Sequence, residues 1–137
     1  MLHQTLTLPT FLTTVVGELM ELNMVYDCLV KNASTEEARR MMEMNRMTVH
    51  HTKKKMDQLY LEMCEEEIPP QYLEALEKPC QLIDFASAIP NAFKEELQLI
   101  NWFKELYLIA PTCYRDAFFA AMVDHGNNAM RLLCLSG

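Results

Sequence analysis

Glycine is scarce in this chain: only Gly17, Gly126 and Gly137 occur among 137 residues. Sheet proteins with many tight turns use glycine where the backbone needs positive φ, so this scarcity argues against a β fold. No apolar run approaches the ~18 residues that a membrane span needs. Half of the residues are hydrophobic, which excludes a disordered chain. Residues 1–137 are therefore predicted to form one globular domain with a sizeable core.

Basic residues are also fewer than acidic ones in this chain. The chain has 12 Lys and Arg residues against 19 Asp and Glu residues, and its net charge is -7. An acidic protein is not attracted to nucleic acid or to an anionic membrane surface, so neither is expected as a partner. The one basic run, Lys53-Lys54-Lys55, is followed by Glu62 and the three glutamates at 65–67. We interpret it as a solvated helix face.

Cysteine pairs and enzyme motifs are missing as well. The five cysteines form no C-x-x-C, and the first Lys or Arg is Lys31, which leaves no positively charged region typical of a signal peptide. Free thiols and a cytoplasmic location are therefore expected. G-x-S-x-G, the P-loop and G-x-G-x-x-G do not occur, which removes support for a hydrolase, an NTPase or a dinucleotide enzyme. The cysteines are Cys28, Cys64, Cys80, Cys113 and Cys134.

The second half of the chain repeats the first at an offset of 77 residues. An αα-hairpin that occurs twice, with a long connection between the copies, predicts an all-α, antiparallel four-helix bundle with a crossover. The repeated positions are Leu22 and Leu99, Tyr26 and Phe103, Leu29 and Leu106, Ala33 and Ala110, and Thr35 and Thr112.

The first hairpin is predicted at about 9–67. Its first helix begins near Pro9 and ends near Asn32, with apolar residues at spacings of three and four. Ser34 and Glu37 form a capping box for the second helix, which is expected to end near Glu67. Asn45 and Thr52 interrupt the apolar stripe of this helix. Polar residues in such a seam fix the register of packing, although they could also line a small cavity.

The crossover is predicted at 70–89, as a helix kinked by Pro79. The second hairpin follows at about 91–135. Pro90-Asn91 is expected to open its first helix, which ends near Ile109, and Thr112 begins the last helix, which ends near Cys134.

One acid in each hairpin points inward on a helical wheel. Glu18 lies about 40° from Leu22 at 100° per residue, and the repeat places Glu95 at the same phase beside Leu99. Buried acids are costly unless they are paired with a cation or a metal. Glu18 and Glu95 are therefore candidate ligands.

With these acids the chain resembles the ferritin-like superfamily, in architecture and repeat more than in motif. The resemblance implies that each hairpin supplies a Glu from its first helix and a Glu-x-x-His from its second. The family's usual spacing places the second-helix motifs at His51-x-x-Lys54 and Asn128-x-x-Arg131. Keeping the inward phase instead places them at Thr48-x-x-His51 and His125-x-x-Asn128. Neither register restores Glu-x-x-His, and half of the carboxylates of a di-iron centre are missing.

Two hypotheses follow for the candidate site. Glu18, His51, Glu95 and His125 could meet at one level of the bundle and hold a single divalent ion of Fe, Mn or Zn, as in a metal-binding protein or a divergent oxidase. Alternatively, both histidines make ordinary hydrogen bonds and no cofactor is bound. In that case the protein is non-enzymatic and acts through protein–protein interaction or as a structural component, and we favour this second hypothesis.

The first hairpin is also similar to that of the spore coat protein F family, in Tyr26, the segment 33–37, Arg39 and His51. That resemblance implies a ferritin-like bundle without an obvious metal site. Met44 and Met47 lie off the packed stripe of their helix. They are either covered by the crossover or form an interaction surface for a partner protein, a peptide or a second copy in a homodimer.

Overall fold

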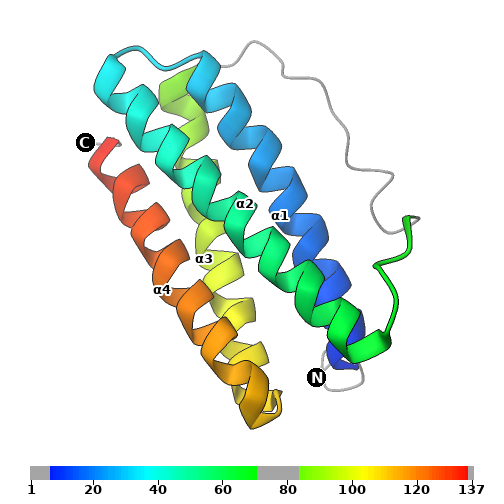
Figure 1. Cartoon of the computed structure of the whole chain (residues 1–137). Helices are drawn as coiled ribbons and strands as arrows, with labels where there is room; N and C mark the ends of the chain where they lie inside the picture. Colours follow the sequence, from blue (N-terminus) through cyan, green and yellow to red (C-terminus); the bar gives the residue numbers. More distant parts are fainter. Residues whose placement is uncertain (1–6, 71–83, 136–137) are drawn as a thin grey trace.

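The computed structural model describes residues 7–70 and 84–135, and within them it contains four helices and no strand. The helices are α1 (Leu8–Lys31), α2 (Glu36–Cys64), α3 (Phe85–Ile109) and α4 (Thr112–Leu135) (Figure 1). The predicted all-α class and the four-helix bundle are confirmed. No described helix is both long enough and apolar enough to cross a membrane.

Hydroxyl caps set the start of the first two helices. The Thr7 side chain accepts a hydrogen bond from the Thr10 backbone N–H, and Pro9 occupies the first turn, as predicted. In α2 the cap is Thr35, which accepts from the Ala38 N–H at 3.0 Å. The predicted cap at Ser34 is therefore wrong by one residue.

The other helix boundaries differ from prediction in two places. α2 ends at Cys64 instead of near Glu67, because Glu65 adopts a left-handed conformation with φ of 58°. α3 begins at Phe85, so Pro90 lies inside the helix and does not open it. Pro90 and Ala86 are both exposed, so the carbonyl that loses its hydrogen bond to proline faces solvent. The predicted kink at Pro79 and most of the crossover lie outside the described residues.

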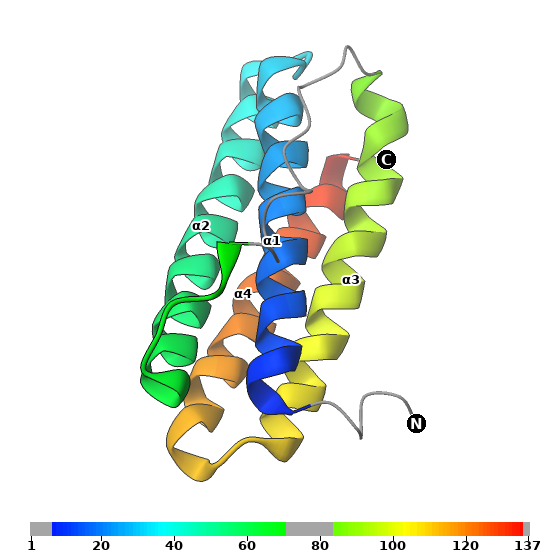
Figure 2. The same ribbon diagram turned by 90° about the vertical axis from the view of Figure 1, so that its right-hand side faces the viewer.

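Each helix packs against two others. α1 contacts α2 and α3, and α4 contacts α3 and α2. Residues 32–35 connect α1 to α2, and residues 110–111 connect α3 to α4, so each pair lies side by side (Figures 1 and 2). The bundle therefore has an interior to which all four helices contribute.

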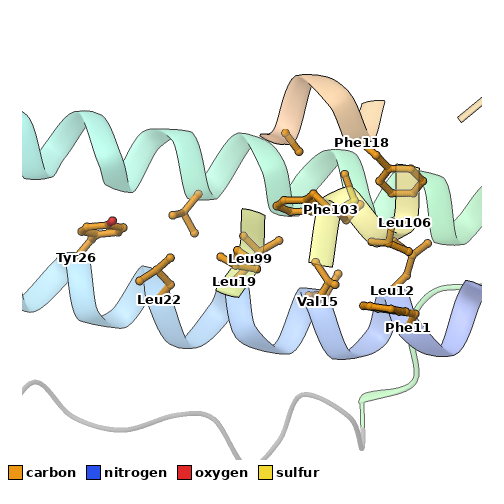
Figure 3. Close-up of a cluster of buried hydrophobic side chains, with 14 of the residues drawn as sticks. Phe11, Leu12, Val15, Leu19, Leu22, Tyr26, Leu99, Phe103, Leu106 and Phe118 are labelled. Carbon is orange, nitrogen blue, oxygen red and sulfur yellow. The ribbon is translucent and has the colours of Figure 1, made fainter. Parts of the chain in front are cut away.

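The repeated apolar positions form the centre of this interior. Leu22, Tyr26 and Leu29 of α1 are fully buried, and so are their counterparts in α3 at positions 99, 103 and 106 (Figure 3). Burying one such side chain contributes about 1.5–3 kcal/mol relative to leaving it exposed. The inward phase that the repeat predicted is correct for these positions.

The cysteines do not all have the predicted free thiol. Cys64, Cys113 and Cys134 are free, whereas Cys28 is disulfide-bonded. Cys80 lies outside the described residues. The expectation of free thiols is therefore wrong for Cys28, and the predicted cytoplasmic location loses that support.

Candidate functional site

Polar side chains from all four helices meet inside the bundle. We call them the buried polar network. Each is at most 6% exposed, although each sits among apolar neighbours. Its members are Tyr26 of α1, Asn45 and Thr52 of α2, Glu96 of α3, and His125 and Asn128 of α4.

Glu96 is the centre of the network. Its Oε2 accepts hydrogen bonds from the Tyr26 hydroxyl at 2.5 Å and from Asn128 Nδ2 at 2.7 Å. Its Oε1 lies 2.6 Å from Nδ1 of His125. Both oxygens of the Glu96 carboxylate therefore have partners inside the bundle, on α1 and α4. Burial, and then the negative charge of Glu96, raise the pKa of Tyr26, so the phenol remains a donor.

His125 connects Glu96 to α2. The Thr52 hydroxyl has a single proton, which it donates to the Thr48 carbonyl at 2.9 Å. The contact of 2.9 Å between Thr52 Oγ1 and His125 Nε2 therefore requires the ring to donate. Nδ1 faces Glu96, so one further proton lies between that nitrogen and the carboxylate. His125 therefore bridges Glu96 of α3 and Thr52 of α2 through its two ring nitrogens, and both side chains of the His125–Glu96 contact are fully buried.

Asn45 and Asn128 tie α2 to α4. Asn45 Nδ2 donates to the Asn128 backbone carbonyl at 3.1 Å, and Asn128 Nδ2 donates to the Asn45 carbonyl at 3.2 Å. Arg131 Nη1 then donates to both side-chain amide oxygens at 3.1 Å. The second amide hydrogen of Asn45 reaches the Tyr26 hydroxyl at 3.3 Å. This reciprocal pairing fixes the register of the two helices.

The network is chemically complete. Within residues 7–70 and 84–135, the only buried side-chain polar atom without a hydrogen-bond partner is Oε2 of Glu95, which is not a member. Two surface hollows lie on the bundle, one of about 360 Å³ beside Lys53 and one of about 190 Å³ beside Phe93. No residue of the buried polar network lines either of them. Thr52, His125 and Glu96 are connected in the order of a nucleophile, a base and an orienting acid, but Thr52 is only 6% exposed and neither of these two hollows reaches it.

A second group of acids lies between α1 and α3. Burial, and then the negative charge of Glu18, raise the pKa of Glu95 to about 7. Burial also raises the pKa of Glu18, with a further contribution from Glu21. Glu18 and Glu95 are both only partly buried. The repeat therefore brought the two predicted acids together, at the edge of the core.

The four predicted metal ligands do not form one cluster. His51 is exposed on α2, and both ring nitrogens of His125 are engaged by Glu96 and Thr52. Nowhere in the described part of the chain do three His, Cys, Asp or Glu side chains stand where they could hold a metal ion. The donor set of the predicted metal site is therefore not assembled.

Glu96 is the residue that sequence reasoning missed. At the repeat offset it aligns with Leu19, a core position, and the search for matching acids selected its neighbour Glu95 instead. The apolar stripe of α3 carried the signal, because the buried residues Ala92, Glu96, Leu99 and Phe103 follow one another at spacings of four, three and four. Asn45 and Thr52 were recognised from the same kind of stripe in α2.

Met44 and Met47 are about half exposed on α2. The predicted cover, the crossover, lies largely outside the described residues, and the exposure of both side chains agrees with their predicted position off the packed stripe. What they contact stays a prediction.

No protein-family model matches the chain, and comparisons with curated proteins and with solved structures found no match. Function therefore has to be argued from the buried polar network and the surfaces alone.

The pKa of Glu95 predicts how stability depends on pH. Its folded-state pKa of about 7 lies above the ordinary value of 4.5. The folded state therefore binds this proton more tightly than the unfolded state does, and Glu95 costs stability as pH rises from about 4.5 through 7. Glu95→Gln removes this loss of stability, because the glutamine side chain does not ionise. We expect the variant to unfold at higher urea concentration than the wild type at pH 8, with a gain on the order of 1–2 kcal/mol after allowing for solvent screening.

At pH 4 the difference should disappear, because both states of the wild type then carry the proton. Glu62→Gln, at an exposed position of α2, is the matched control and should show no pH-dependent difference. A loss of stability in Glu95→Gln at pH 8 would contradict the assignment.

Proposed function

We propose that this protein is a non-enzymatic helical bundle that acts through protein–protein interaction or as a structural component. In this proposal its topology is ferritin-like, with two antiparallel hairpins joined by a crossover. The observation that carries the proposal is the closure of the buried polar network. Glu96 and His125 occupy the interior where a bundle protein would bind a metal, yet their polar atoms are held by Tyr26, Asn128 and Thr52.

The network supports a structural role on chemical grounds. The carboxylate of Glu96 already accepts hydrogen bonds from Tyr26 and Asn128 and contacts His125, so a divalent ion would have to compete with these partners for the same two oxygens. Both ring nitrogens of His125 are engaged, Nδ1 by Glu96 and Nε2 by Thr52, so a metal could bind the ring only by displacing one of these partners. The same side chains connect α1, α2, α3 and α4, so the network holds the helices in one register.

Metal addition tests the proposal. The untagged protein is unfolded by heat in EDTA and then with Mn²⁺, Zn²⁺ or Fe²⁺ added, and the purified protein is subjected to elemental analysis. We expect no near-stoichiometric metal and the same melting temperature in all conditions. A resident ion present at a hundred times its Kd would stabilise the fold by about 2.7 kcal/mol, which is easily detected.

Glu95→Gln and Glu62→Gln are the matched variants for this experiment. Metal near one ion per chain, together with a rise in melting temperature that Glu95→Gln abolishes and Glu62→Gln retains, would overturn the proposal. That result would favour the alternative, a metal-binding protein, for which the sequence predicted the ligands Glu18, His51, Glu95 and His125.

A further inference from the structure

The outer face of α4 carries a regular row of exposed apolar side chains. Phe119, Val123, Met130 and Leu133 are each about half exposed. With Gly126 between them, they follow one another at spacings of four, three, four and three residues. This is the spacing of a seam along which one helix packs against another. We call these five residues the α4 row.

Gly126 has no packing role within its own chain. A Cβ atom added there would meet nothing within 4 Å. Glycine in the interior of a helix is destabilising relative to alanine, so alanine would fit this position better in the isolated bundle. Because glycine has no side chain, however, the axis of a second helix can come closer at this point than at any larger residue. Its place at the centre of the α4 row therefore indicates a contact outside the bundle.

The row is close to symmetric about that glycine. Phe119 lies seven residues before Gly126 and Leu133 seven after it, while Val123 lies three before and Met130 four after. A twofold axis near Gly126 would run two copies of α4 in opposite directions. It would then place Phe119 of one copy against Leu133 of the other, and Val123 against Met130. Such self-complementarity is what an isologous interface requires.

Charge also favours a second copy on this face. α4 carries Arg115 and Arg131 against Asp116 and Asp124, so its formal net charge is zero in a chain whose net charge is -7. Arg131 is turned toward α2, where it binds Asn45. The α4 faces of two acidic chains can therefore meet without adding net charge repulsion of their own.

The size of the face sets the expected affinity. At 1.5 Å per residue the 24 residues of α4 extend about 36 Å, and a helix face about 10 Å wide gives roughly 400 Å² per copy. A standard stable interface uses about 800 Å² per partner. The C-terminal end of α3 extends the surface, because Leu108 is exposed next to Tyr107, whose ring centroid lies 6.1 Å from that of Phe119. Association in the micromolar range is expected.

We propose that the α4 row is the interface of a homodimer in which the α4 helices of two copies cross in opposite directions at Gly126. This inference does not rest on the proposed function, since it uses a different face of the molecule and would hold with or without a metal.

Sedimentation velocity of the full chain over a range of concentrations tests the proposal. The wild type should change from monomer to dimer in the micromolar range. Gly126→Gln is the decisive variant, because the added side chain enters open space in the monomer and improves helix propensity, yet blocks the crossing point. We expect it to weaken dimerisation at least about tenfold, as for a central interface residue, without lowering the melting temperature of the monomer.

Asn127→Gln, at the exposed neighbouring position, is the matched control and should dimerise like the wild type. A wild type that stays monomeric at the highest concentration would overturn the proposal, and so would a Gly126→Gln variant that dimerises normally. If Met47→Gln abolishes the dimer while Gly126→Gln does not, the interface lies on α2 instead.

Discussion

Replacing Glu96 by leucine should lower the free energy of unfolding by about 3–5 kcal/mol, as expected when a buried carboxylate with three hydrogen-bond partners is removed. Leucine fills a similar volume, so the loss is not that of a cavity. It arises because the Tyr26 hydroxyl, the Asn128 amide and His125 Nδ1 all lose their acceptor in a place that water does not reach. Urea unfolding at pH 7, with the m-value checked against the wild type, measures the change.

Glu96→Gln separates hydrogen bonding from charge. Its amide oxygen can accept from Tyr26 and Asn128, and its NH₂ can donate to Nδ1 of a neutral His125 whose Nε2–H still reaches Thr52. Every polar atom then keeps a partner, so we expect a loss of only about 1 kcal/mol. The account of the network is wrong if Glu96→Gln destabilises as much as Glu96→Leu. It is also wrong if Glu96→Leu costs less than the glutamine variant.

The neighbouring glutamates make a further comparison possible. Glu95→Gln should stabilise the protein at pH 8, whereas both substitutions at Glu96 should destabilise it. Two adjacent acids on one helix therefore have effects of opposite sign. The difference lies in their partners, since Glu96 accepts three hydrogen bonds while Oε2 of Glu95 is buried and has none.

Helix positions could be predicted from the sequence because apolar periodicity and capping chemistry are local. Pro9 and the hydroxyl caps marked the start of α1 and α2 to within a residue or two. The helix start predicted from Pro90 was wrong, because proline usually occupies the first turn of a helix. In α3 it lies inside the helix, where the exposed start of α3 accommodates the missing hydrogen bond. The phase of the repeat predicted which faces are buried, since Leu22 and Leu99 share one environment.

The contents of the site could not be predicted in the same way. The repeat relates backbone positions, and it correctly brought Glu18 near Glu95. The repeat does not indicate which polar side chains form hydrogen bonds with one another between helices. Glu96 aligns with Leu19, and Asn45 pairs with Asn128 at an offset of 83 residues instead of 77. The network therefore breaks the symmetry of the repeat, and only the relative placement of the four helices reveals it.

Replacing Asn128 by alanine is expected to lower the free energy of unfolding by about 2–4 kcal/mol. The side chain donates to the Asn45 carbonyl and to the charged Glu96, and it accepts from Arg131. Hydrogen bonds to charged groups are worth about 1.5–3 kcal/mol and neutral ones about 1 kcal/mol, although the three are not additive because Glu96 and Arg131 retain other partners. Urea unfolding at neutral pH provides the measurement.

Asn127→Ala is the matched control for Asn128→Ala, because the two asparagines are adjacent in α4 but only Asn127 is exposed. Alanine has the higher helix propensity, so Asn127→Ala should leave stability unchanged or raise it by up to about 0.7 kcal/mol. An Asn128→Ala variant as stable as Asn127→Ala would show that the hydrogen bonds of the Asn128 side chain contribute nothing to the fold. A loss confined to Asn128→Ala would instead show that these bonds, to the Asn45 backbone carbonyl, Glu96 and Arg131, stabilise the packing of α4 in the bundle.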